Sequence, residues 1–259
     1  MQIRFISLTL SILASLAASA NAESPTGREI AVKMDAVDTS LDSERTATMV
    51  IERGSQRLIR ELSMKAKKYG VDERSLIRFV EPADVRDTQY LSWTYDAVNQ
   101  EDDLWVFFPS ENLIRRISGG GKKGSFMRSD FANEDIESRA VDDDVHTFIE
   151  TTTFGERDVH VIESRPIPAK AKDSNYALRR TWVDAERWLA LKVEYFDKRD
   201  RMIKRLSQGG VEEIDGIWTA TKLIMETPRK NSRTLMQYSG VRYNMDLTDS
   251  VFEQTALER

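Results

Sequence analysis

Strand-length segments in which apolar and polar residues alternate follow one another along most of this 259-residue chain. Ala47, Met49 and Ile51, for example, are separated by single residues, which places all three on one face of an extended strand. The segments predicted as strands are 46–51, 58–66, 75–80, 89–95, 104–108, 113–117, 145–152, 158–163, 178–183, 189–196, 202–207, 217–226 and 233–239. This pattern predicts a mainly β protein with short strands and few helices.

Tight turns join many of these segments and constrain how the strands pair. Asp215-Gly216 lies between two alternating segments and is the strongest hairpin signal in the chain. Strands joined by tight turns form a meander, and a meander of this length curls into a barrel or half-barrel. No unit of about 20 to 50 residues repeats, which disfavours a propeller or a solenoid.

One helix is predicted before the first strand. Thr26 and Glu29 are spaced as a capping box, and an apolar stripe follows at helical spacing. The stripe consists of Ile30, Met34, Val37 and Leu41. It predicts a helix that lies on a hydrophobic surface, either an ordinary core or the roof of a cavity.

Residues 118–144 interrupt the strand pattern. A glycine-rich stretch at 118–124 predicts a flexible loop, and the segments 126–131 and 134–136 predict short helical turns. A second loop is predicted at 166–175, where proline, lysine and polar residues gather.

The first 22 residues have the pattern of an export signal. A short basic start precedes an apolar run at 5–18, and Ala20-Asn21-Ala22 supplies the small-x-small pattern of a signal-peptidase site. The sequence therefore predicts a signal peptide at 1–22, and a soluble periplasmic protein of residues 23–259 that forms a single domain. Beyond the signal, no apolar stretch is long enough to predict a membrane span.

No residue pattern predicts a catalytic or a metal centre. His146 and His160 fall in predicted strands without partners at metal-ligand spacing, so both are interpreted as satisfied or exposed side chains. The acidic runs 101–103 and 142–144 lack the spacing of a calcium loop and are interpreted as solvated turns. The chain has no cysteine, which excludes thiol chemistry, and its charges form no basic stripe, which argues against a nucleic-acid partner.

Two of the predicted strands, 76–80 and 104–108, are apolar on both faces. A flat sheet packed on one side would expose one of these faces. A curved sheet with helices on its concave side would bury both, and it could hold an acyl chain in an apolar pocket. A dry core and a lipid-binding cavity are both compatible with this pattern.

Several short motifs occur in order along the chain. The most specific is Phe126-Met-Arg-Ser-Asp-Phe131, preceded by Arg115-Arg-Ile-Ser118 and followed by Glu134-Asp-Ile136. The other motifs are Ser75-Leu-Ile, Glu81-Pro-Ala-Asp-Val85, Leu104-Trp-Val-Phe-Phe-Pro109, Leu191-Lys-Val-Glu-Tyr-Phe196, Ile214-Asp-Gly-Ile-Trp-Thr219 and Leu257-Glu-Arg259. Together they resemble the LolA-like outer membrane lipoprotein-sorting protein family over nearly the whole mature chain.

The resemblance implies an unclosed antiparallel β half-barrel with helices covering its concave face. It implies a periplasmic carrier, not an enzyme and without a cofactor, that shields lipid or lipoprotein acyl chains in transit to the outer membrane. An RND-type inner-membrane transporter is the partner that the resemblance suggests. The alternative is a non-carrier periplasmic interaction or lipoprotein-sensing module of the same fold. A hydrolase is disfavoured because the sequence shows no polar cluster for the cavity.

The expected binding site is an apolar groove gated by residues 126–131. The side chains expected to line it lie on two neighbouring strands and in the gating segment: Leu91, Trp93, Tyr95, Val106, Phe108, Phe126, Met127 and Phe131. In the empty state, Phe126, Met127 and Phe131 are expected to fill the groove, because an empty apolar cavity loses packing contacts. The glycines at 119–121 and Gly124 are expected to let the segment move when cargo arrives.

Overall fold

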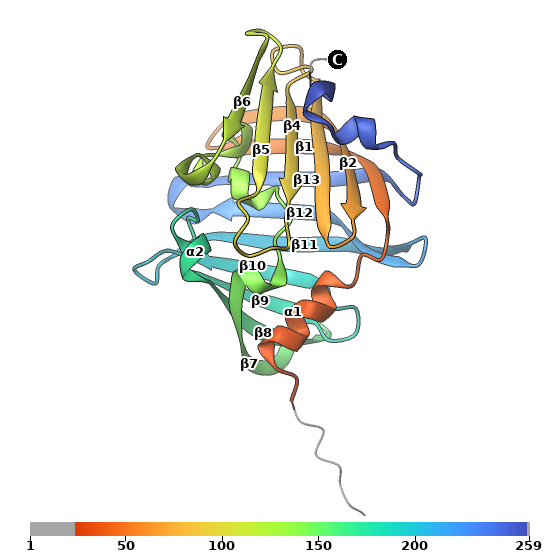
Figure 1. Ribbon diagram of the computed structural model, residues 1–259. Helices are drawn as coiled ribbons and strands as arrows, with labels where there is room; N and C mark the ends of the chain where they lie inside the picture. Colours follow the sequence, from red (N-terminus) through yellow and green to blue (C-terminus); the bar gives the residue numbers. More distant parts are fainter. Residues whose placement is uncertain (1–23, 258–259) are drawn as a thin grey trace, which may run out of the picture.

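The computed structural model describes residues 24–257, and its main element is one antiparallel sheet of 13 strands (Figure 1). The strands are β1 (Asp42–Arg53), β2 (Gln56–Tyr69), β3 (Asp72–Glu81), β4 (Gln89–Thr94), β5 (Asp103–Phe108), β6 (Leu113–Ile117), β7 (Asp144–Phe154), β8 (Arg157–Pro166), β9 (Leu178–Asp184), β10 (Ala190–Phe196), β11 (Met202–Ile214), β12 (Ile217–Thr227) and β13 (Ser232–Tyr243). Their order across the sheet is β6-β5-β4-β3-β2-β1-β13-β12-β11-β10-β9-β8-β7. β6 and β7 are its two edges, so the sheet is not closed into a barrel.

The sheet curls so strongly that its two halves face each other. In Figure 1, β4 and β5 stand steeply in front of β12 and β13, which run across the molecule. The predicted mainly β, unclosed half-barrel is therefore confirmed. Asp215 and Gly216 join β11 to β12 with φ values of 51° and 81°, the left-handed conformation that a two-residue hairpin turn of this kind requires.

The helix α1 (Gly27–Asp35) begins at the predicted capping box. The Thr26 hydroxyl accepts a hydrogen bond from the Glu29 amide at 3.2 Å, and the Glu29 carboxylate accepts one from the Thr26 amide at 2.7 Å. The buried face of α1 packs through Ile30 against Ile162 of β8 and Val183 of β9. The helix therefore covers the concave face near the β7 edge of the sheet.

The predicted apolar stripe of this helix is too long by its last two members, because Val37 already lies in the turn that follows the helix. The helix ends at Asp35, and Leu41 lies in the connection to β1 with 69% of its surface exposed. Because the chain has left the helix there, Leu41 no longer shares a face with Ile30. No helix within residues 24–257 combines the length and the apolar character that crossing a membrane requires.

The interruption at 118–144 forms short 3₁₀ helices. They are η1 (Gly119–Lys123), η2 (Phe126–Arg128), η3 (Asn133–Asp135) and η4 (Val141–Asp143). Helical turns were predicted at 126–131 and 134–136, whereas the helix at 119–123 replaces the predicted flexible loop and the helix at 141–143 was not predicted. The segment 166–175, predicted to be a loop, contains the one-turn helix α2 (Pro168–Ala171). A proline in the first turn is compatible with a helix, because the amide that it lacks has no partner at that position.

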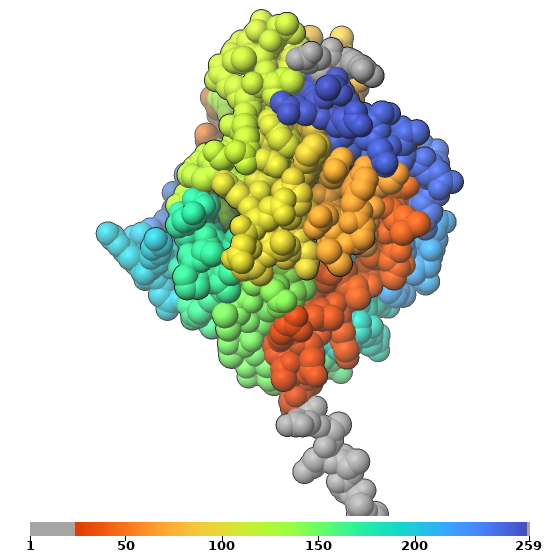
Figure 2. Space-filling view, viewed as in Figure 1, coloured from red at the N-terminus to blue at the C-terminus, as the bar shows by residue number. Residues whose placement is uncertain are grey.

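The C-terminal segment contains η6 (Asp249–Phe252) and η7 (Gln254–Ala256), and η5 (Pro228–Lys230) lies in the turn between β12 and β13. Figure 2 shows the C-terminal segment, in dark blue, against the yellow and orange strands. Its buried Phe252 and Leu257 pack against Leu91, Trp105 and Phe107 on the outer face of β4 and β5. The chain thus covers its own second apolar face.

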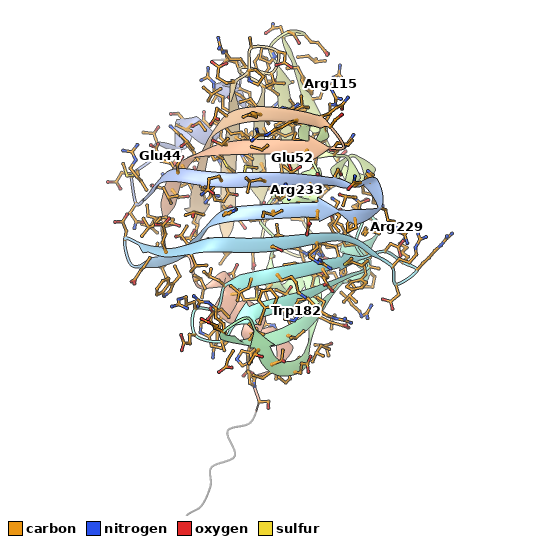
Figure 3. All side chains as sticks on the ribbon, turned by 180° about the vertical axis from the view of Figure 1, so that it is seen from behind. Glu44, Glu52, Arg115, Trp182, Arg229 and Arg233 are labelled. Carbon is orange, nitrogen blue, oxygen red and sulfur yellow. The ribbon has the colours of Figure 1, made fainter. Side chains whose placement is uncertain are left out.

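The back of the sheet is polar over β1 and β13. Figure 3 shows Glu44, Glu52 and Arg233 on this side, and Arg233 Nε lies 2.6 Å from Glu52 Oε2. Exposed ion pairs of this kind make this part of the convex face hydrophilic. The concave face is therefore the side of the sheet that suits an apolar ligand.

Candidate functional site

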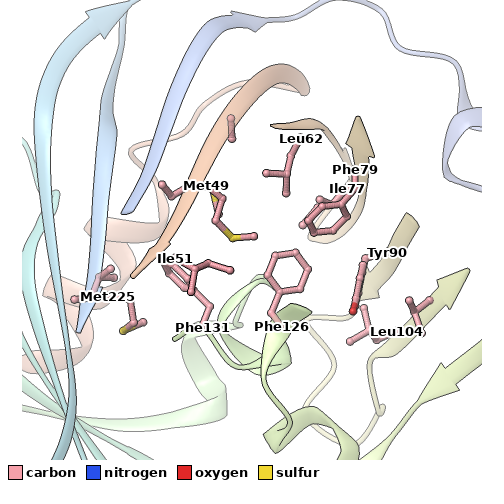
Figure 4. Close-up of a cluster of buried hydrophobic side chains, with 14 of the residues drawn as sticks. Met49, Ile51, Leu62, Ile77, Phe79, Tyr90, Leu104, Phe126, Phe131 and Met225 are labelled. Atoms are coloured by element: carbon pink, nitrogen blue, oxygen red, sulfur yellow. The ribbon is translucent and has the colours of Figure 1, made fainter. Parts of the chain in front are cut away.

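Phe126 lies at the centre of the largest hydrophobic cluster, on the concave side of the sheet (Figure 4). Its ring is fully buried and meets the rings of Tyr90, at 4.9 Å between centroids, and Phe79, at 5.6 Å. Phe131 is also buried in this cluster, and Met127 packs against it. All three side chains therefore lie inside the half-barrel.

Residues 126–131, called the plug below, fold back on themselves. The Phe126 amide donates to the Phe131 carbonyl at 2.8 Å, which brings both rings to the same side. Met127 and Arg128 have φ values of 46° and 65°. Left-handed backbone at two consecutive non-glycine residues is unfavourable by itself, so surrounding contacts must hold the turn.

The first of these contacts is a buried anchor at Asp130. Its carboxylate accepts hydrogen bonds from the hydroxyls of Thr227, at 2.6 Å, Thr234, at 2.9 Å, and Ser232. Its backbone amide donates to the Thr234 hydroxyl at 2.9 Å. Hydrogen bonds to a buried carboxylate are stronger than neutral ones, so Asp130 ties the plug to β12 and β13.

The second contact comes from the opposite wall. Arg60 of β2 is buried, and its guanidinium donates to the Met127 carbonyl. Burial lowers the pKa of Arg60 from its ordinary value. The plug is therefore held by β2 on one side and by β12 and β13 on the other.

A cavity of about 230 Å³ lies beside the plug on the concave face. Its apolar walls come from both halves of the sheet and from the plug, and include Leu62, Met64, Ile77, Leu223, Met236 and Phe131. A cavity of about 150 Å³ holds benzene, so on that scale this one has room for about nine carbon atoms. The concave side thus offers space for part of an acyl chain without any movement of the plug.

A second cavity of about 220 Å³ lies on the other side of Glu137 and Ser138, and it is polar. Lys122 is buried there, with its Nζ 2.9 Å from Glu137 Oε2 and 3.6 Å from Asp102 Oδ2. Burial raises the pKa of Glu137 to about 7, although Lys122 acts in the opposite direction. The inside of the half-barrel therefore contains the polar cluster that the sequence did not reveal.

The acidic runs that were interpreted as solvated turns contribute to this polar region. Asp143 and Asp144 are buried, and Asp144 Oδ2 lies 2.5 Å from Arg139 Nε. Asp143 Oδ1 lies 3.1 Å from Nζ of Lys170. The interpretation of Asp143 and Asp144 as solvated was wrong. Arg139 is only five residues from Asp144, but Lys170, the partner of Asp143, comes from a segment that the sequence does not place nearby.

Of the two neighbouring strands, β4 presents a different face to the concave side than expected, whereas β5 presents the expected one. Tyr90 pairs with Val106 across β4 and β5, whereas Leu91 pairs with Trp105. Val106 belongs to the cluster around the plug, and Phe108 packs against it.

The prediction that Leu91, Trp93 and Tyr95 line the same groove as Val106 and Phe108 is therefore wrong. Leu91 and Trp93 pack against the C-terminal segment, and Trp93 Nε1 donates to the Phe252 carbonyl at 2.8 Å. The Tyr95 hydroxyl donates to Asp103, the residue that pairs with Trp93. Alternation identified which residues share a face, but not which face is concave.

Sequence reasoning missed several residues of the cavity. Leu223 of β12, Met236 of β13 and Arg45 of β1 line it although they lie far apart in the sequence. Their strands were predicted, and the alternation within β12 and β13 assigns Leu223 and Met236 each to one face of its strand. The pairing of β1 with β13, which brings the two halves together, left no local signal.

Both histidines lie in strands and have hydrogen-bond partners. The ring nitrogens of His146 lie 2.8 Å from the Ser164 hydroxyl and 2.8 Å from the Val141 carbonyl. His160 lies 2.9 Å from the Thr151 hydroxyl, and its ring stacks on Trp188. Among the residues described, no three His, Asp or Glu side chains are grouped as metal ligands.

Comparison with known proteins relates this architecture to solved structures. A family model described as an uncharacterized protein matches residues 71–259. A DUF1329 family protein from Desulfovibrio piger is similar, with 42% identity and a TM-score of 0.86 over 89% of this chain and 97% of that chain. A comparison with curated proteins found no match.

Two further structures are similar over most of their length. A putative outer membrane lipoprotein-sorting protein domain from Vibrio parahaemolyticus has 28% identity and a TM-score of 0.85, covering 90% of this chain and 98% of its own. A LolA superfamily protein from Nitrosomonas europaea has 21% identity and a TM-score of 0.72, covering 90% and 99%. The LolA-like fold expected from the motifs is confirmed.

Proposed function

The chain belongs to the DUF1329 family, and from that premise we propose that it is a periplasmic carrier for acyl chains. In this proposal it binds lipid or lipoprotein acyl chains in the concave cavity and moves them toward the outer membrane. The observation that carries the proposal is the cavity of about 230 Å³ beside the plug, with apolar walls on both halves of the sheet. The similar protein from Vibrio parahaemolyticus, described as a putative lipoprotein-sorting domain, supports the same direction.

The energetics of the cavity suit a carrier. Burying about nine methylene groups at about 0.8 kcal/mol each contributes on the order of 7 kcal/mol, before the entropic cost of association. After that cost the affinity is moderate, and moderate affinity allows cargo to be passed on. A chain longer than about nine carbons must extend out of the cavity or displace Phe126 and Phe131, so the gating role of the plug is part of the proposal.

The cellular setting is also part of the proposal. Residues 1–22, outside the described part of the chain, are the proposed signal peptide, and residues 23–259 are proposed to act as one domain. An RND-type inner-membrane transporter is the proposed donor or acceptor of the cargo. The role is non-enzymatic, with the polar cluster around Lys122 acting in structure and recognition.

Native mass spectrometry of the protein purified from its own periplasm tests this function. We expect the intact mass to equal that of a chain that begins at Glu23. A fraction of the molecules should carry additional mass, and organic solvent should remove this mass as lipid. Purified protein that neither retains lipid nor binds a fluorescent fatty acid would contradict the carrier role. That result would favour the interaction or sensing module of the same fold.

A further inference from the structure

Arg45 is a cation that lines the concave cavity. Within the described part of the chain, it has no acidic partner. It lies on β1, lines the cavity, and is partly buried. Its guanidinium lies over the ring of Tyr238, with the central carbon 4.7 Å from the ring centroid. Stacking on an aromatic ring fixes the plane of the guanidinium but satisfies none of its N–H donors in that plane.

Among residues 24–257, no carboxylate lies within ion-pair distance of Arg45, and its buried Nε has no hydrogen-bond partner. The neighbouring cations differ in this respect. Lys65 pairs with Glu44 at 3.8 Å, and Lys122 pairs with Glu137 at 2.9 Å. A buried donor without a partner is costly, so its presence in a cavity points to a ligand that supplies the acceptor.

The carboxylates that line the same cavity are bonded to other groups. Glu73 accepts from the Ser138 hydroxyl, and burial raises the pKa of Glu73 from its ordinary value. Asp135 accepts from the Tyr176 hydroxyl at 2.8 Å and lies 3.3 Å from Nζ of Lys204. Arg45 acts on Glu73 only through space, where its charge lowers the pKa of that carboxyl against the larger effect of burial. The N–H donors of Arg45 are therefore available to whatever enters.

We propose that the cavity binds a single-chain amphiphile with an anionic head group, a carboxylate or a phosphate, and that Arg45 binds the head group. This inference rests on the proposed function and names the class of its ligand. The planar guanidinium can donate two parallel hydrogen bonds to such an oxyanion. The tail then lies against Met64, Ile77 and Met236, on the apolar walls.

The test is a calorimetric titration of the mature protein, near neutral pH, with three ten-carbon ligands: decanoate, decyl phosphate and decanol. The three alkyl chains have about the length that the cavity holds, so the ligands differ only in their head group. We expect at least about tenfold tighter binding of the two anions than of the alcohol, as a charge-assisted hydrogen bond provides. Decanoate and decyl phosphate distinguish the carboxylate from the phosphate as the preferred head group.

The matched variants are Arg45→Met and Arg53→Met. Both remove one positive charge from β1, but Arg53 is exposed at the end of the strand, outside the cavity. Arg45→Met should lower the affinity for both anions to that for decanol and leave decanol binding unchanged. Arg53→Met should bind all three ligands like the parent. If Arg45→Met does not fold, Arg45→Gln takes its place with the same expectation.

The possible outcomes distinguish a failure of the head-group assignment from a failure of the proposed carrier function. If the parent binds decanol as tightly as the anions, or if Arg45→Met keeps the preference for anions, the head-group assignment is overturned and the carrier role stands. If none of the three ligands binds the parent, the carrier role itself fails.

Discussion

The two faces of β4 and β5 both bury large side chains, but different parts of the molecule cover them. On the outer face, Leu91 and Trp105 are covered by Phe252 and Leu257 of the C-terminal segment. On the concave face, Tyr90 and Val106 meet the plug, and an open cavity lies close by. An apolar face must be covered, but the face alone does not determine what covers it. Whether the chain itself or a ligand covers it depends on which other segments the fold brings to that face.

Truncating one buried ring on each side should sharpen this comparison most. Phe126→Ala and Phe252→Ala each remove a fully buried ring, so each should lower the free energy of unfolding by about 3–5 kcal/mol. Only Phe126→Ala should change the binding of a fluorescent fatty acid, because it enlarges the space beside the plug. Denaturant unfolding and ligand titration measure the two effects. A Phe252→Ala protein that folds but loses binding would place the site on the outer face.

A carboxyl group on each side should respond differently to pH. Burial raises the pKa of Glu137 from 4.5 to about 7, so the folded state holds a proton that the unfolded state has released. Its stabilising contribution is complete below about pH 4.5 and is lost as the pH rises to about 7. The stability difference between Glu137→Gln and the parent should therefore change across this window, by at most about 3 kcal/mol.

The matched control is Asp249→Asn in the outer cover. Hydrogen bonds from Lys67 and Tyr69 lower the pKa of Asp249 below its ordinary 3.8, and the group is exposed. Its stabilising contribution is therefore lost only at more acidic pH, and the difference between this variant and the parent should be flat from pH 5 to 8. Melting temperatures at several pH values measure both variants. A flat Glu137→Gln difference over the same range would show that Glu137 is ionised throughout.

The smallest expected effect concerns how firmly the plug is held. Asp130→Asn keeps the shape of the side chain but weakens the hydrogen bonds from Thr227, Ser232 and Thr234, at a cost of about 1–2 kcal/mol. A looser plug should admit long acyl chains more readily and leave a ten-carbon chain unaffected. Stopped-flow binding of fatty acids with 10 and 16 carbons measures this. Equal rates for parent and variant with the longer chain would mean that the plug does not gate the cavity.

Much of the fold was predictable from local sequence. Period-two alternation located the strands, Asp215-Gly216 located a hairpin, and the Thr26–Glu29 capping box located the start of α1. These features depend on neighbours a few residues apart, so the sequence carries them directly. The motif around Phe126 and Phe131 also identified the segment that fills the half-barrel.

The candidate site was only partly predictable. Val106, Phe108 and the plug residues lie inside as expected, whereas Leu91 and Trp93 face the opposite way. Alternation separates the two faces of a strand without saying which one is concave. That choice depends on the direction in which the whole sheet curls.

By itself, the sequence determined which residues form strands, where several turns fall, and which side chains share a face. Only the tertiary structure decided which face is inside, that the C-terminal segment covers the other, and that Arg45 has no acidic partner among residues 24–257. The physical reason is range. Backbone conformation and alternation follow from adjacent residues, but burial and charge pairing follow from segments up to about 200 residues apart that meet when β1 pairs with β13.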